Sequence, residues 1–138
     1  MLKIKYNGNA TFALLNQAGR STNFSITFLG DRIYLNERRG NIVGIQDFGN
    51  LHELAKHIEQ FYPKSLSAFR KVNFLRAVAE CLPIPYKADH ISVGSYHIWT
   101  DNIIKGDGRR DFIVGSFDDC LRFLEQEFSR LAASCIYE

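Results

Sequence analysis

Cysteines are scarce in this sequence, and none of them forms a metal-binding motif. Only three occur among 138 residues, at Cys81, Cys120 and Cys135, and no two have the spacing of a CxxC pair. An odd number of widely spaced cysteines argues against a disulfide scaffold and against a cysteine-ligated zinc site. We therefore expect buried or incidental thiols.

Long apolar runs are also absent. No stretch approaches the roughly 20 residues that a helix needs to cross a bilayer. The N-terminal segment, Met-Leu-Lys-Ile-Lys-Tyr, alternates between apolar and charged residues and lacks the apolar centre of a signal peptide. The sequence therefore predicts a cytoplasmic protein that makes no membrane contact.

Positive and negative charges nearly balance in this chain. The formal net charge is +2 at pH 7, too small to indicate nucleic-acid binding without a clustered basic face. The residues are 46% hydrophobic and 23% charged, which is typical of a folded globular protein and not of a disordered one. We expect one domain over residues 1–138, with no repeat or linker.

The first 48 residues show the alternation of apolar and polar side chains that strands require. Asn7-Gly8 and Gly30-Asp31 are turn pairs that can connect neighbouring strands, and Arg38–Asn41 is a further turn. The pattern predicts a meander of three to five antiparallel strands, with strand segments near residues 2–6, 11–15, 24–28, 32–36 and 42–45.

At Asn50 the apolar spacing changes to that of a helix. Asn50 and Glu53 form a capping pair, and the helical spacing continues to Phe61 before Pro63 ends it. A second helical run extends from about Ser65 to Cys81, before the corner Pro83-Ile-Pro85. Because few residues connect the two runs, we expect a helical hairpin or a kinked pair.

Strands return after this corner. His90–Val93 and Tyr96–Thr100 flank Gly94, which predicts either two short strands or one strand with a bulge. Ile103 and Ile104 lead into the loop Lys105–Gly108. A strand over Arg110–Gly115 follows.

The last predicted helix is the clearest element of the chain. Ser116 can cap its first turn, with Asp119 completing a capping box in its shorter carboxylate form. Phe117, Leu121 and Leu124 begin an apolar stripe that continues at helical spacing through Phe128 and Leu131. The order strands, helices, strands, helix predicts an α+β fold. We expect one antiparallel sheet, built from the N-terminal meander and the C-terminal strands and covered on one face by about three helices.

Histidine and carboxylate residues suggest one weak catalytic arrangement. His52 and His57 are five residues apart, whereas two metal ligands on one helical face require a spacing of three or four. His90 and His97 are an odd number apart, so they share a strand face only across a bulge at Gly94. One alternative function is therefore a small hydrolase that uses His97 with Asp101 or Asp111 for acid–base chemistry.

Two basic turns provide another alternative. The loop that starts at Lys105 contains glycines but lacks the spacing of a phosphate-binding loop, and it precedes a strand instead of a helix. If this loop and the turn after residue 37 lie at the same end of the sheet, their cations would form a patch able to contact a nucleic-acid backbone. That patch would contain Arg38, Arg39, Lys105, Arg109 and Arg110.

The last helix and an aromatic strand are candidates for a protein interface. Asp118, Asp119 and Glu125 give the helix an acidic face, which would attract a basic protein because opposed charge speeds encounter. Tyr96 and Trp99 would provide exposed rings on the preceding hairpin.

The C-terminal segment RRDFIVGSFDDCLRFLEQEFSRL, within a small aromatic-rich α+β chain, resembles bacterial immunity proteins of contact-dependent growth inhibition and related polymorphic toxin systems. The resemblance implies stoichiometric binding of a cognate protein toxin, often a nuclease, by blocking its active site. It also implies no catalysis by this chain and no cofactor. The sequence specifies neither the partner nor the oligomeric state.

Overall fold

The computed structural model describes residues 2–101 and 110–137, with side chains described as far as residue 131. It confirms the α+β fold class, with antiparallel sheets of five and three strands. The chain forms two compact units, Met1–Phe74 and Leu75–Glu138. The single domain expected over residues 1–138 stays a prediction.

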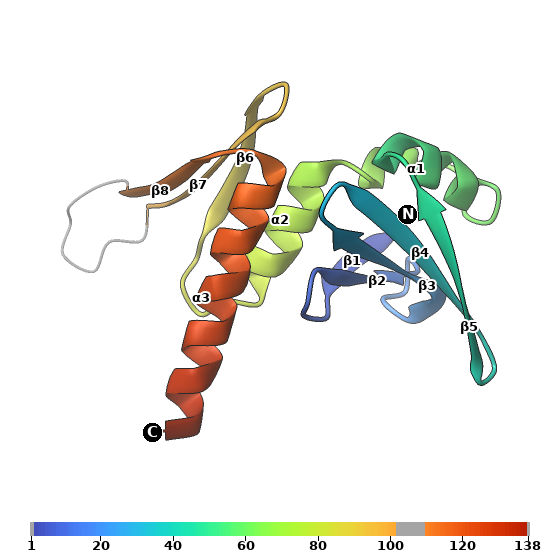
Figure 1. Cartoon of the computed structure of the whole chain (residues 1–138), viewed down its shortest axis with the longest axis horizontal. Coiled ribbons are helices and arrows are strands. Elements are labelled where there is room, and N and C mark those ends of the chain that lie inside the picture. Colours follow the sequence, from blue (N-terminus) through green and yellow to red (C-terminus); the bar gives the residue numbers. More distant parts are fainter. Residues whose placement is uncertain (1, 102–109, 138) are drawn as a thin grey trace. The chain divides into compact units, whose positions relative to one another are not determined.

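The N-terminal unit contains the predicted meander, with each strand hydrogen-bonded to the next along the chain (Figure 1). The tight turns supply the necessary backbone freedom: Gly8 has a φ of 90° in the first hairpin and Gly40 a φ of 63° in the last. Sequence alternation therefore predicted this sheet correctly. Its strands are β1 (Lys3–Tyr6), β2 (Thr11–Leu15), β3 (Ser21–Leu29), β4 (Arg32–Arg39) and β5 (Ile42–Phe48).

Aromatic rings fill the core of this unit. Phe12 is completely buried, and its ring centroid lies 5.3 Å from that of Tyr6, 5.8 Å from Phe28 and 5.0 Å from Phe74. Edge-to-face and tilted ring pairs of this kind stabilise a core beyond the area they bury. The other sheet face has hydroxyl and amide side chains, and Asn36 donates hydrogen bonds to Ser25 and Thr27.

Helix α1 (Leu51–Glu59) begins as predicted, because the Asn50 side chain accepts a hydrogen bond from the Glu53 backbone N–H at 2.9 Å. The second predicted helix is wrong in its first part. Residues 65–81 form a short 3-10 helix, η1 (Leu66–Ala68), and then α2 (Lys71–Glu80). The carbonyl of Ala68, which a continuous helix would pair with Val72, accepts instead from the Asn73 side chain at 3.0 Å.

The C-terminal unit contains a second sheet, in the order β6 (Lys87–Ser92), β7 (Ser95–Thr100) and β8 (Arg110–Gly115). The strands thus divide between two sheets, where the sequence led us to expect one. Every described pairing joins strands adjacent in the sequence, and no described strand connects the meander to β6–β8. Gly94, with a φ of 74°, lies in the β6–β7 turn, so this segment is two strands.

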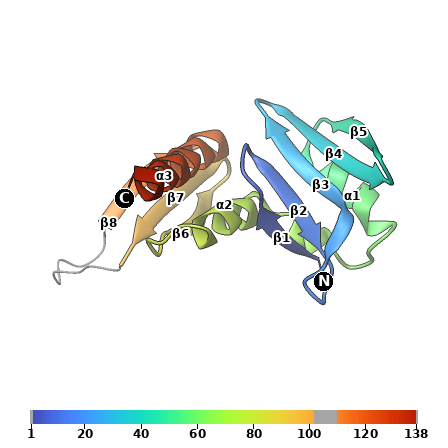
Figure 2. The same ribbon diagram turned by 90° about the horizontal axis from the view of Figure 1, so that it is seen from below.

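Helix α3 (Phe117–Tyr137) covers one face of the second sheet (Figure 2). Of the predicted apolar stripe Phe117, Leu121 and Leu124 are buried, together with Cys120, whereas Phe128 and Leu131 are only partly buried. Burial raises the pKa of the Cys120 thiol, whereas Cys81 is exposed. The side chain of Cys135 lies outside the described part. No helix of the described residues is long and apolar enough to span a membrane.

Candidate protein-binding surfaces

One end of the three-stranded sheet brings together the β6–β7 turn, the end of β8 and the start of α3 (Figure 1). This follows from the antiparallel pairing, because β6 ends where β7 begins and β8 returns to the same end. We call this region the hairpin-end surface and define it by five residues. They are Ile91, Val93, Val114, Asp118 and Asp119.

The three apolar members of the hairpin-end surface are each more than half exposed. Val114 is in register with His97, which is in register with Asp89, and Ile91 follows Asp89 by two residues. Val93 lies in the turn between the strands. Large apolar side chains exposed within one small region are a common mark of an interaction site.

Two exposed carboxylates lie at the same end of the sheet, on α3, which covers the sheet face opposite to that of Val114. Asp118 and Asp119 lie in the first turn of α3, where the partial positive charge of the helix end stabilises them. The predicted cap is present, because the Ser116 hydroxyl accepts from the Asp119 backbone N–H at 3.1 Å. Arg122 is also exposed, one turn further along. Glu125, the third predicted acid, is only partly exposed, and one of its carboxylate oxygens is buried with no hydrogen-bond partner among the described residues.

The expectation that Tyr96 presents an exposed ring is wrong. Its side chain is 7% exposed, because it lies on the face of β7 that α3 covers, with the ring of Phe117 at 6.1 Å. Trp99 lies on the opposite face and is half-buried. Its indole N–H donates to Asp89, and the Lys87 ammonium lies 4.9 Å from the ring centroid. Trp99 is therefore held within the sheet.

Two of the three residues of the predicted catalytic arrangement meet. His97 Nε2 lies 2.8 Å from Asp111 Oδ1, across the β7–β8 pairing. Asp101 instead accepts from Lys87 at 2.9 Å, and this bond lowers the pKa of the Asp101 carboxyl. His97 is 7% exposed and its ring stacks on Trp99, so little of the imidazole is left for a substrate. His90 stacks on Tyr96 and so lies on the other face of the sheet.

The predicted arginine residues belong to different units. Arg38 and Arg39 end strand β4, and Arg110 begins β8, where its guanidinium lies 5.0 Å from the Phe112 ring centroid. Arg39 is paired with Glu37 at 3.1 Å. Lys105 and Arg109 lie outside the described residues. Within the described part, no group of three or more histidine, cysteine or acidic residues could hold a metal ion.

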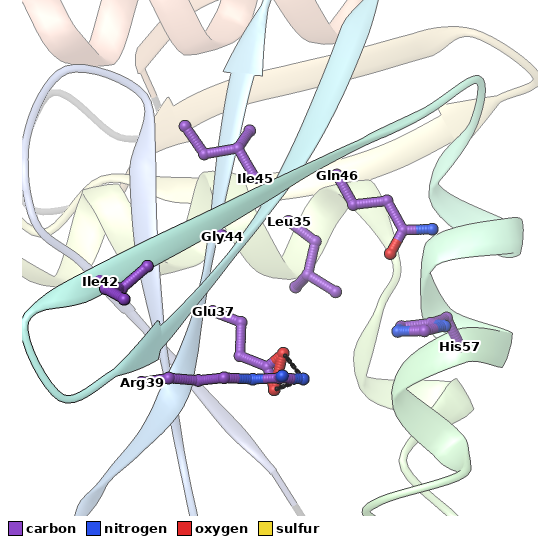
Figure 3. Close-up of a pocket in the computed structure, with 8 residues that line it drawn as sticks. All are labelled: Leu35, Glu37, Arg39, Ile42, Gly44, Ile45, Gln46 and His57. Carbon is purple, nitrogen blue, oxygen red and sulfur yellow. Dashed lines mark hydrogen bonds and ion pairs between the residues drawn. The ribbon is translucent and has the colours of Figure 1, made fainter.

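A second candidate surface lies at β5, an edge strand of the five-stranded sheet. Ile42, Val43 and Ile45 are 73%, 50% and 68% exposed. The hairpin of β4 and β5 extends beyond α1, so no helix described in this unit covers the end of the hairpin (Figure 1). Beside it is a hollow of about 350 Å³. Its lining residues are Leu35, Glu37, Arg39, Ile42, Gly44, Ile45, Gln46 and His57 (Figure 3).

The exposed apolar residues of both surfaces were absent from the sequence-based site prediction. Ile42 and Val43 are adjacent, so they lie on opposite faces of their strand. Apolar residues on both faces indicate a strand buried on both sides, but β5 lies at an edge. The sequence contains the pattern without specifying the position of the strand in the sheet.

No family model, curated protein sequence or solved structure matches this chain.

Proposed function

We propose that this chain is a non-catalytic protein-binding module that acts as an immunity-type inhibitor of a protein toxin. The observation that carries the proposal is the hairpin-end surface, where exposed apolar side chains of β6–β8 and exposed Asp118 and Asp119 of α3 lie at the same end of the sheet. An apolar centre with a charged rim is the usual composition of a specific protein interface.

Charge indicates the kind of partner. Asp118 and Asp119 lie at the hairpin end, whereas Lys87 and Arg110 begin β6 and β8 at the opposite end of the sheet. At that opposite end Lys87 and Arg110 are accompanied by exposed Asp101 and Asp111, whereas the hairpin end has two aspartates against one exposed arginine, Arg122. The hairpin end therefore has the excess of carboxylates, and it complements a basic surface. A toxin that acts on nucleic acid presents such a surface around its active site. An inhibitor of this kind would act in the cytoplasm and would need no cofactor.

The test is co-purification of the tagged chain from its native host, followed by mass spectrometry of the intact complex. We expect one stoichiometric protein partner with a basic surface. The Asp118→Lys/Asp119→Lys variant should bind it at least about tenfold more weakly, mainly through slower association at low salt.

A matched control variant distinguishes binding through the hairpin-end surface from a general effect of the net charge of the chain. Asp31→Lys reverses an exposed carboxylate in the turn between β3 and β4, so it should leave the affinity unchanged. Val114→Ser tests the apolar part of the same surface and should speed dissociation. Equal affinity for the wild-type chain and the double lysine variant would remove the hairpin-end surface from the proposal.

A further inference from the structure

Strand β5 differs from the other strand edges in having no charged residue over its first five positions, Ile42–Gln46. Edge strands are normally protected from pairing by charged side chains. The opposite edge, β1, carries exposed Lys3 and Lys5, and the edges of the second sheet carry charges at Lys87 and Arg110. The β5 edge therefore has a single charged residue, Asp47, and none over most of its length.

The apolar residues of β5 are also suited to pairing with themselves. When two copies of β5 pair in antiparallel fashion about a twofold axis, the two sheets join with matching faces. Residues on one face of the first copy then lie beside residues on the same face of the second copy. In the register that opposes Ile45 to its own copy, Val43 lies opposite Asp47 and Ile42 opposite Phe48. The most exposed apolar side chains of β5 would then be covered on both faces of the joined sheet.

Charge along the β4–β5 hairpin favours the same arrangement. Arg38 is in register with Val43, and Asp47 lies near the other end of β5. Asp47 is paired with Arg32 but its side chain stays 41% exposed. Because the two copies of β5 run in opposite directions, Arg38 of one copy lies in the same row as Asp47 of the other.

We infer that β5 is a homodimer interface, in which a second copy of this chain pairs with it and joins two five-stranded sheets into one continuous sheet. This inference is independent of the proposed toxin binding, which uses residues of the C-terminal unit. It needs no residue of the hairpin-end surface.

The first experiment is sedimentation equilibrium of the full chain. We expect a concentration-dependent dimer, and Ile45→Lys should raise its dissociation constant about tenfold or more, because it places a charge at the centre of the pairing. Leu29→Lys is the matched control: Leu29 is 64% exposed at the end of β3, against 68% for Ile45, and its replacement should leave the dimer intact. Circular dichroism would verify that both variants fold.

The second experiment tests the register. In a Cys81→Ser/Cys135→Ser background, Ile45→Cys should form an intermolecular disulfide under mild oxidation, because opposed residues of an antiparallel pair have Cβ atoms about 4.5–5.5 Å apart. Leu29→Cys in the same background should stay monomeric under denaturing conditions. A wild-type chain that is monomeric at all concentrations would overturn the inference, as would a dimer that Ile45→Lys leaves unchanged. A monomer that captures a strand of another protein at β5 would also overturn it.

Discussion

At the level of single residues, Tyr86 contacts two aromatic rings and a carboxylate within the C-terminal unit. Its ring is buried, with the rings of Phe112 and Phe123 at 5.0 and 5.9 Å. Its hydroxyl donates to Glu127 at 3.0 Å, and Glu127 also accepts from Arg130 at 2.7 Å. The bond from Arg130 is the main cause of a lowered pKa at the Glu127 carboxyl. One carboxylate therefore holds both the phenol and the guanidinium.

Tyr86 should ionise late. Burial, with the bond to Glu127 as the second cause, raises its pKa from 10.0 to about 12. Since the unfolded chain releases this proton first as the pH rises, the stabilisation is complete below pH 10 and is lost between about pH 10 and 12. Ultraviolet absorbance of the phenolate measures the ionisation. Tyr86→Phe should remove the late step, whereas Tyr62→Phe should retain it. An alkaline profile that Tyr86→Phe leaves unchanged would contradict the assignment.

At the level of elements, two helices begin with side-chain caps that the sequence predicted. Asn50 caps α1 and Ser116 caps α3, each by accepting from the backbone N–H three residues later. Such caps are local, because the donor and acceptor are within one turn. This is why they could be predicted without knowledge of the sheets that the helices cover.

Removing the cap of α3 should destabilise the C-terminal unit. Ser116→Ala leaves the Asp119 backbone N–H without its side-chain acceptor, and we expect a loss of about 0.5–2 kcal/mol in the free energy of unfolding. Ser116→Asp should restore most of it. Urea denaturation followed by the fluorescence of Trp99, the single tryptophan, measures the effect in this unit. Ser129→Ala, at an exposed position inside α3, is the control and should cost nothing; an equal loss in both alanine variants would refute the cap.

At the level of the whole molecule, α2 contributes residues to both compact units. Phe74 belongs to the aromatic core of the N-terminal unit, while Arg76 donates to the Ala88 carbonyl of the C-terminal unit at 3.0 Å. Unfolding either unit removes contacts that stabilise this helix. We therefore expect the units to unfold together, in accordance with the single domain that chain length predicts.

Phe12→Ala tests this coupling. Loss of this completely buried ring should destabilise the N-terminal unit by about 3–5 kcal/mol. If unfolding is coupled, Phe12→Ala should lower two denaturation midpoints by the same amount. One is the midpoint from the fluorescence of Trp99, in the C-terminal unit, and the other is the midpoint from far-ultraviolet circular dichroism. The wild-type chain should show coincident midpoints. The units would unfold separately if Phe12→Ala left the Trp99 midpoint unchanged while part of the dichroism signal was lost at a lower denaturant concentration.

The sequence by itself determined the local features of this protein. Alternation and turn residues predicted a meander of three to five strands, and capping pairs predicted the starts of α1 and α3. These features depend on residues within a few positions of each other, so each local pattern has one favourable backbone conformation. The break between η1 and α2 was missed; there the Asn73 side chain bonds to the Ala68 carbonyl in competition with the helix, which apolar spacing does not indicate.

Only the tertiary structure decided which side chains are exposed. It buried Tyr96 under α3, paired His97 with Asp111 while Asp101 bonded to Lys87, and left Ile42 and Ile45 uncovered at an edge. The same apolar pattern suits a strand in the middle of a sheet and a strand at its edge, because period-2 alternation specifies the faces of a strand and not its neighbours. Exposure depends on contacts between segments far apart in the sequence, and those contacts exist only after the sheets and helices have packed.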